Sequence, residues 1–197
     1  IIPVPDSGVP AAIGYSEKIK KSVELGIIRN HYVGRTFIEP TQQIRSFGVK
    51  LKHNINKSLV KNKSLVLIDD SLVRGTTSVK IIKMLYEAGA KEVHLRIASP
   101  PIKYPDYYGV DTPRQNELLA SKLDIEGMRK FINASTLQFL SIDGLYKSMG
   151  YEKRNWSYPQ FTDHCFTGEY PVKPIDADNK DLLNDQPSLI SSKYWQK

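Results

Sequence analysis

The chain has 197 residues, 40% of them hydrophobic, which is enough to bury one substantial core and too few to predict two domains. With 25% charged and 10% aromatic residues, its composition is unlike that of a disordered protein. Its formal charge of +7 favours an anionic partner. The lysines are scattered and form no compact basic arm, so we expect a phosphorylated small molecule or a merely solvated basic surface, and no nucleic acid.

Cys165 is the only cysteine, which excludes an intramolecular disulfide and fits a reducing compartment. No apolar run reaches membrane-spanning length, and no leader-like segment precedes the first predicted strand. We therefore expect no membrane association and a cytoplasmic location. Residues 1–4 already have the pattern of a buried strand and include no initiating Met, so we expect the sequence to begin inside a domain.

In chain order, residues 1–4 predict a strand, residues 5–8 a turn, and residues 10–25 a helix that Gly26 ends. Residues 27–44 show no clean period and predict a long loop of the kind that often carries function.

Residues 64–68 form a short apolar run that is typical of a central parallel strand. A helix over residues 76–88 and a third strand over residues 93–98 are predicted to follow. Because strands alternate with helices, the pattern indicates an α/β fold with right-handed crossovers.

The later part of the chain predicts three helices that pack beside the sheet, over residues 115–123, 124–132 and 141–149. Asp124 and Ser141 are suited to be N-caps of the second and third. The polar composition of residues 174–197 predicts a poorly ordered tail, which leaves one domain over residues 1–173.

The strongest local motif is residues 66–78, where an apolar strand ends in Asp69 and Asp70 and a Gly75-Thr-Thr-Ser turn opens a helix. Unpaired backbone N–H groups at a helix N-terminus can enclose a phosphate, and glycine permits close approach. Two carboxylates would repel that phosphate unless they face ribose hydroxyls or a bridging magnesium ion. The same residues can also simply cap a helix. The spacing of a Walker loop is missing, which disfavours a nucleotide triphosphatase.

Residues 69–78 resemble the phosphoribosylpyrophosphate loop of the type I phosphoribosyltransferases. Residues 3–8, 29–38 and 109–113 resemble only the glutamine phosphoribosylpyrophosphate amidotransferase family within that superfamily, and the matches run from residue 1 to about residue 171. The resemblance implies an α/β fold of the type I phosphoribosyltransferase kind, a doubly wound and mainly parallel sheet with additional C-terminal helices. The family's N-terminal glutaminase domain is absent from this sequence.

The resemblance also implies which residues form the site. Ser7, Asp69 and Asp70 are expected to bind magnesium, and the catalytic residues are expected in a flexible loop that closes over the substrate. That loop contributes Tyr32, Arg35 and Thr36. The implied substrate-binding residues are Asp6, Ser7, Gly8, Lys52, Asp69, Asp70, Ser71, Arg74, Gly75, Thr76, Thr77 and Ser78. An ordinary turn at residues 5–8, a solvated connector in place of the flexible loop and a solvent-facing Lys52 remain alternatives.

The activity implied is that of an amidophosphoribosyltransferase, a pentosyltransferase that displaces pyrophosphate from phosphoribosylpyrophosphate with ammonia. The product is 5-phosphoribosylamine, in the first step of de novo purine (IMP) synthesis. Ammonia would come from glutamine through the missing domain, so we expect this chain alone to make none and its activity alone to be in doubt. Purine nucleotide inhibitors and a homodimer or homotetramer are implied as well.

Two alternatives come from other classes of function. One is a non-catalytic module that senses phosphoribosylpyrophosphate or a purine nucleotide. The resemblance of residues 29–38 to the enzyme's closing loop argues against it. The other is a base-salvage transferase, which residues 27–44 disfavour because they do not resemble a salvage hood.

Some members of the family hold an iron–sulphur cluster on four cysteines, two of them in a Cys-x-x-Cys before Phe-Thr-Gly. Here that segment retains only Cys165, and Asp106 stands where cluster-bearing members place another cysteine. We therefore predict no iron–sulphur cluster. His164 next to Cys165 could begin a zinc site, but no second cysteine or spaced histidine is near in sequence, so a buried structural cysteine is expected.

Overall fold

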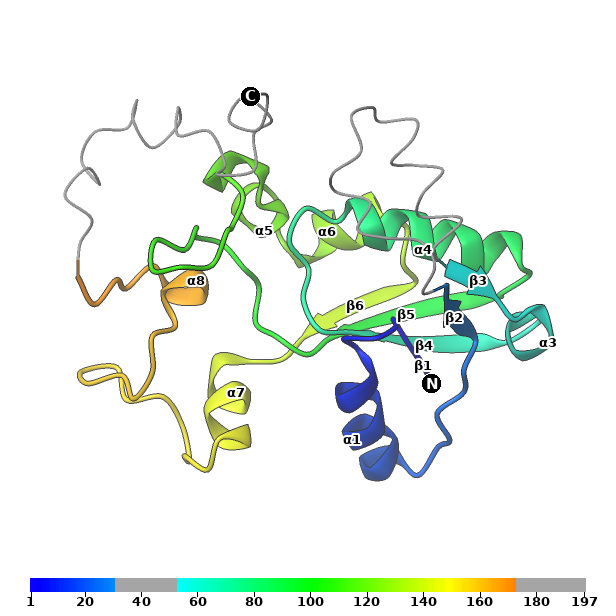
Figure 1. Cartoon of the computed structure of the whole chain (residues 1–197), viewed down its shortest axis with the longest axis horizontal. Coiled ribbons are helices and arrows are strands. Elements are labelled where there is room, and N and C mark those ends of the chain that lie inside the picture. Colours follow the sequence, from blue (N-terminus) through cyan, green and yellow to red (C-terminus); the bar gives the residue numbers. More distant parts are fainter. Residues whose placement is uncertain (31–52, 173–197) are drawn as a thin grey trace, which may run out of the picture.

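The computed structural model describes residues 1–30 and 53–172, and a parallel four-stranded sheet lies at its centre (Figure 1). The strand order is β1-β4-β5-β6. The strands are β1 (Ile2–Pro3), β4 (Ser64–Asp69), β5 (Glu92–Ile97) and β6 (Thr136–Phe139). Leu67 at the middle of β4 pairs with Ile2 on one side and Leu95 on the other. The apolar runs of the strands are buried because both faces of the sheet are covered.

Helices cover both faces, as a doubly wound sheet requires. On one face lie α4 (Thr76–Glu87) and α6 (Ile125–Ile132), and on the other lie α1 (Val9–Ile19) and α7 (Ile142–Ser148) (Figure 1). The core between sheet and helices consists of buried aliphatic side chains. Those that are at most 2% exposed include Ile2, Leu67, Ile81, Leu85, Leu95, Met128 and Ile132. This confirms the predicted α/β architecture.

Smaller elements complete the described part. A two-stranded antiparallel sheet pairs β2 (Ile27–Arg29) with β3 (His53–Ile55). The short helices are α3 (Lys57–Val60), the 3-10 helix η2 (Gln115–Glu117), α5 (Leu119–Lys122) and α8 (His164–Thr167). No helix among the described residues is long and apolar enough to cross a membrane.

Two predicted N-caps are confirmed. The Asp124 carboxylate accepts a hydrogen bond from the backbone N–H of Gly127 at 2.7 Å, and the Ser141 hydroxyl accepts one from Gly144 at 2.9 Å. Each side chain satisfies one of the first N–H groups of its helix. The second and third of the late helices therefore begin where the sequence predicted.

Three predictions need correction. The helix predicted over residues 10–25 ends at Ile19, because Lys20 takes a left-handed backbone conformation and caps it. The loop predicted over residues 27–44 begins with a strand, β2, whose partner is distant in sequence. The helix predicted over residues 115–123 is interrupted by Leu118, whose backbone is extended. The remainder of the predicted loop and the predicted tail over residues 174–197 lie outside the described residues.

Candidate functional site

The two sequence segments predicted to bind substrate meet at one edge of the sheet. The turn at residues 5–8 follows β1, and residues 70–78 follow β4, its parallel neighbour, so both leave the sheet at the carboxyl ends of strands. The backbone N–H of Val4 donates to the carbonyl of Ile68 at 2.8 Å. A Cβ atom added at Gly8 would lie 2.4 Å from that same carbonyl oxygen. Only glycine lets the turn pack this closely against the end of β4.

The two acidic residues stand at the end of β4 in different environments. Asp69 is 7% exposed, whereas Asp70 is exposed to solvent. The carboxylate of Asp69 accepts a hydrogen bond from the backbone N–H of Asp70 at 3.0 Å. Burial, and next the negative charge of Asp70, raise the pKa of Asp69 to about 8. Asp69 therefore keeps its proton near neutral pH unless a cation comes close to the pair.

An oxygen-rich set of this kind fits magnesium. Carboxylate and hydroxyl oxygens are the ligands that a hard cation prefers, and Asp69, Asp70 and Ser7 offer only these. A cation beside Asp69 would also offset the unfavourable charge that burial and Asp70 impose on it. The described residues thus fit the predicted ion, although its coordination stays a prediction.

The N-terminus of α4 is the part of the candidate site predicted to bind a phosphate. Gly75 precedes the helix with a φ of 76°, in the left-handed region that favours glycine, and no side chain caps the first turn. Thr76 and Thr77 are exposed, while Ser78 is 4% exposed. The free N–H groups and the positive end of the helix dipole favour a phosphate there.

Two of the predicted substrate-binding residues form ion pairs on the surface. Asp6 pairs with Arg29 of β2, and Arg74 pairs with Glu117 at 2.8 Å. Pairs this exposed contribute only about 0–1 kcal/mol, so both arginines can exchange their carboxylate for another anion at little cost. Arg29 was not among the predicted site residues. Its ion pair with Asp6, 23 positions earlier in the chain, is a tertiary contact that no local pattern indicates.

The predicted catalytic residues Tyr32, Arg35 and Thr36, and the predicted substrate-binding Lys52, lie outside the described residues. Their roles stay predictions.

Asp106 and Cys165, which the resemblance compares with cluster ligands, do lie together, with Cys165 Sγ 3.9 Å from Asp106 Oδ2. A set with one thiolate does not fit an iron–sulphur cluster that needs four.

A parallel sheet covered by helices on both faces, with an acidic pair after a central strand and an uncapped helix N-terminus beside it, defines a phosphoribosyltransferase domain of the type I fold. The acidic pair and α4 are contributed by the same strand–loop–helix unit.

No family model matches the chain. Among curated relatives, the amidophosphoribosyltransferase of Rhizobium etli is 56% identical over 193 residues, which are 98% of this chain and 39% of the relative. The chloroplastic amidophosphoribosyltransferase 2 of Arabidopsis thaliana is 53% identical over 94% of this chain and 33% of the relative. The solved structure of the B. subtilis glutamine phosphoribosylpyrophosphate amidotransferase, complexed with ADP and GMP, matches with a TM-score of 0.75 at 49% identity. The match covers 86% of this chain and 37% of that one.

The chain is therefore homologous to amidophosphoribosyltransferases over nearly its whole length, and the match is consistent with their phosphoribosyltransferase portion. It spans 33% to 39% of the length of these two curated relatives.

Proposed function

We propose that this chain binds phosphoribosylpyrophosphate and transfers ammonia to it, as the phosphoribosyltransferase part of an amidophosphoribosyltransferase. The products would be phosphoribosylamine and pyrophosphate, in the first step of purine synthesis. The observation that carries the proposal is the meeting of the turn at residues 5–8 with the acidic pair and the α4 N-terminus at one sheet edge. The names of the relatives that are 53% and 56% identical support the enzyme over a non-catalytic sensor.

In this proposal the first turn of α4 binds the 5-phosphate of the ribose. Its backbone N–H groups carry no side-chain cap, and the exposed hydroxyls of Thr76 and Thr77 add donors. Gly75 lets the loop approach the phosphate closely, while Leu119 and Phe131 pack behind it. The helix then fixes one end of the substrate through backbone groups that do not need to reorganise.

Asp69 and Asp70 bind the middle of the substrate. Their carboxylates can accept hydrogen bonds from the two ribose hydroxyls, or hold magnesium together with Ser7. Magnesium bound there supplies positive charge for the departing pyrophosphate. The turn at residues 5–8 lies against the end of β4, and a pyrophosphate bound at this turn can take the place of Asp6 as the partner of Arg29.

This arrangement needs no protein nucleophile. Ammonia is itself the nucleophile, so the chain contributes by holding the ribose in one orientation and by stabilising the charge of the leaving group. In the proposal, closure of the loop that contains Tyr32, Arg35 and Thr36 excludes water, which would otherwise compete with ammonia.

The proposed partners follow from the same family. Purine nucleotides are proposed as ligands because the solved B. subtilis relative is complexed with ADP and GMP. The homodimer or homotetramer stays a prediction. The cytoplasmic location also stays a prediction, since the Arabidopsis relative is chloroplastic.

Calorimetric titration of the full chain with phosphoribosylpyrophosphate, with and without magnesium, tests the proposal. We expect magnesium-dependent binding that is lost when Asp69 and Asp70 are both changed to Asn. Glu87→Gln is the matched control, because it makes the same acid-to-amide change at the opposite, exposed end of α4 and should leave the affinity unchanged. Binding that survives in the Asp69/Asp70 variant would refute the assigned site.

A further inference from the structure

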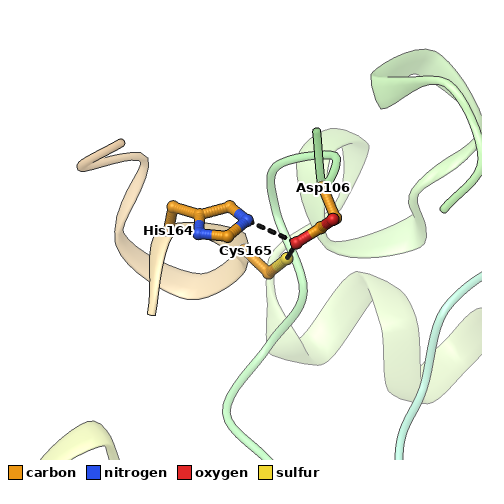
Figure 2. Close-up of side chains that lie close together, drawn as sticks. All are labelled: Asp106, His164 and Cys165. Carbon is orange, nitrogen blue, oxygen red and sulfur yellow. Dashed lines mark hydrogen bonds and ion pairs between the residues drawn. The ribbon is translucent and has the colours of Figure 1, made fainter. Parts of the chain in front are cut away.

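A second cluster of polar side chains lies away from the candidate phosphate site, between the loop after β5 and α8 (Figure 2). Asp106 comes from the loop, and His164 and Cys165 come from the first turn of α8. His164 Nε2 lies 2.7 Å from Asp106 Oδ2, and Cys165 Sγ lies 3.9 Å from the same oxygen. The three atoms lie within 4.8 Å of one another. A nitrogen, a sulphur and an oxygen ligand therefore converge on one small volume.

The cluster is shielded from solvent and its carboxylate is oriented. The side chains of Asp106 and His164 are only 7% and 5% exposed. The Oδ1 atom of Asp106 accepts hydrogen bonds from the backbone N–H groups of Tyr108 at 2.8 Å and Val110 at 2.9 Å. These bonds leave Oδ2 facing His164 and Cys165, as Figure 2 shows. Outer hydrogen bonds of this kind are what orient the carboxylate ligand of a metal ion.

The buried imidazole of His164 uses only one of its two ring nitrogens in a hydrogen bond among the described residues. Its ring lies edge-on to Tyr108 and tilted against Tyr170, each with ring centroids 4.9 Å apart. Its Nδ1 atom is buried and has no hydrogen-bond partner among the described residues, so only Nε2 is used. Nε2 is therefore the ring nitrogen that faces the other two side chains, and it is the atom available to a metal ion.

We propose that Asp106, His164 and Cys165 bind one divalent transition-metal ion, best matched by zinc, with a fourth position left for water. Zinc accepts this mixture of ligands, and three protein ligands with one open position is an established zinc arrangement. The carboxylate and a thiolate balance the charge of a divalent ion, which allows the ion to be buried. Binding releases the thiol proton to solvent, and the imidazole proton resides on Nδ1 while Nε2 donates its lone pair to the metal.

The distances require only small adjustments. Around a tetrahedral zinc ion the nitrogen and carboxylate oxygen would be about 3.3 Å apart, and the sulphur and oxygen about 3.6 Å apart. The observed separations are 2.7 Å and 3.9 Å. If an ion replaces the proton between Nε2 and Oδ2, the imidazole moves away from the carboxylate and the sulphur moves toward it, each by less than about 1 Å. The ligand atoms then reach the bond lengths of a zinc site.

The ion would join two segments that the chain already brings together. The backbone N–H groups of Lys103 and Tyr104 donate to the carbonyl of Cys165 at 2.9 and 3.1 Å. Metal bonds from Asp106 and Cys165 would reinforce this contact between the loop after β5 and α8. Bound metal should therefore raise the midpoint of thermal unfolding.

Titration of the tag-free full chain with cobalt(II), followed by competition with zinc, tests the proposal. We expect one equivalent of cobalt to bind, with the visible absorption of a tetrahedral site and a sulphur-to-cobalt charge-transfer band, and zinc to displace it. Cys165→Ser should abolish the charge-transfer band. Asp106→Asn should weaken zinc binding by about 100-fold or more, since changes to outer-shell partners alone cost about 10–100-fold.

His94→Gln is the matched control for a histidine effect, because His94 lies on β5 and pairs with Glu92 and Thr136, away from the cluster. It should bind metal as the parent chain does. Circular dichroism will check that each variant is folded. Cys165→Ser is the variant least expected to disturb packing, because serine and cysteine side chains are similar in size. If the folded parent binds no cobalt or zinc, or if Cys165→Ser binds them with unchanged affinity and spectrum, the three residues are only a hydrogen-bonded contact and the proposal is wrong.

Discussion

At the scale of single residues, the charge of the buried Asp69 carboxyl links the candidate site to the pH dependence of stability. Its pKa is raised to about 8 by burial and by Asp70, so the folded chain holds a proton that the unfolded chain releases near pH 4. Stability from this proton is fully present below the unfolded pKa and is lost as the pH rises through the folded pKa.

We therefore expect the chain to be less stable to urea at about pH 9 than at about pH 6, and expect Asp69→Asn to reduce that difference. Magnesium should restore stability selectively at the higher pH, where the carboxylate is charged. Urea unfolding at both pH values, with and without magnesium, measures this. An unchanged pH dependence in Asp69→Asn would show that the pKa of Asp69 is not raised.

Arg154 is the most deeply buried cation among the described residues, with its side chain 0% exposed. It bonds Asp163 through Nε at 2.5 Å and Glu169 through Nη2 at 2.6 Å, and it lies 4.2 Å from the ring of Trp156. Desolvation would raise the pKa of Asp163, but the bonds from Arg154 and Tyr146 outweigh it and lower that pKa. The pair holds the segment after α7 against α8.

Arg154→Met is expected to destabilise the chain by about 3–5 kcal/mol, because it leaves the buried carboxylate of Asp163 without its partner. Lys83→Met is the control, since Lys83 is exposed and only loosely paired with Glu87, and it should change stability by less than about 0.5 kcal/mol. Urea unfolding near pH 7 measures both. Equal effects of the two substitutions would contradict the role of Arg154.

At the scale of elements, the start of α4 requires a glycine, whereas the interior of α1 does not. Gly75 has a φ of 76°, and a Cβ there would lie 2.8 Å from Leu119 Cδ2. Gly14 lies inside α1, and a Cβ there would meet nothing within 4 Å. The same substitution at these two positions should therefore act in opposite directions.

We expect Gly75→Ala to destabilise the chain by about 1–3 kcal/mol and to weaken binding of phosphoribosylpyrophosphate, because the strain lies in the loop that must enclose the phosphate. Gly14→Ala should stabilise by about 0.5–1 kcal/mol and leave binding unchanged, since alanine favours a helix interior. Thermal unfolding and calorimetry compare the pair. A Gly75→Ala chain with parental stability and affinity would argue against this account of the loop.

At the scale of the whole molecule, β4 connects the core to the candidate site. Leu67 is 0% exposed and lies between β1 and β5, two residues before Asp69. Packing there keeps β1 in register with β4, and so keeps the turn at residues 5–8 beside the acidic pair.

Leu67→Ala should cost about 2–5 kcal/mol of stability. It should also weaken substrate binding, although Leu67 is not one of the proposed site residues, because β1 has only two paired residues. Ile13→Ala on the surface of α1, where Ile13 is 48% exposed, should do neither. Urea unfolding and calorimetry on the same samples measure both effects. If a destabilised but folded Leu67→Ala chain binds substrate as well as the parent does, packing at Leu67 does not position the site.

The strand, acidic pair and helix start of the candidate site were predictable as local structure because they are adjacent in sequence. An apolar strand, two acids, a glycine and a helix start follow one another within residues 64–78, and the structure has β4, Asp69 and α4 at the predicted places. The N-caps Asp124 and Ser141 were predictable for the same reason, since a cap bonds a group three residues away. Short elements without a strong period, such as β6 and α8, were missed.

The sequence by itself thus determined the α/β class, the order of the main strands and helices and the acidic phosphate-loop motif, because local preferences and hydrophobic periods are properties of adjacent residues. Tertiary structure alone decided which distant segments meet: the turn at residues 5–8 against Ile68, Arg29 with Asp6, and Asp106 with His164, which is 58 positions further along the chain. No local preference specifies such pairs. They form because burial of the core and pairing of the parallel strands offset the entropy of closing the intervening loops.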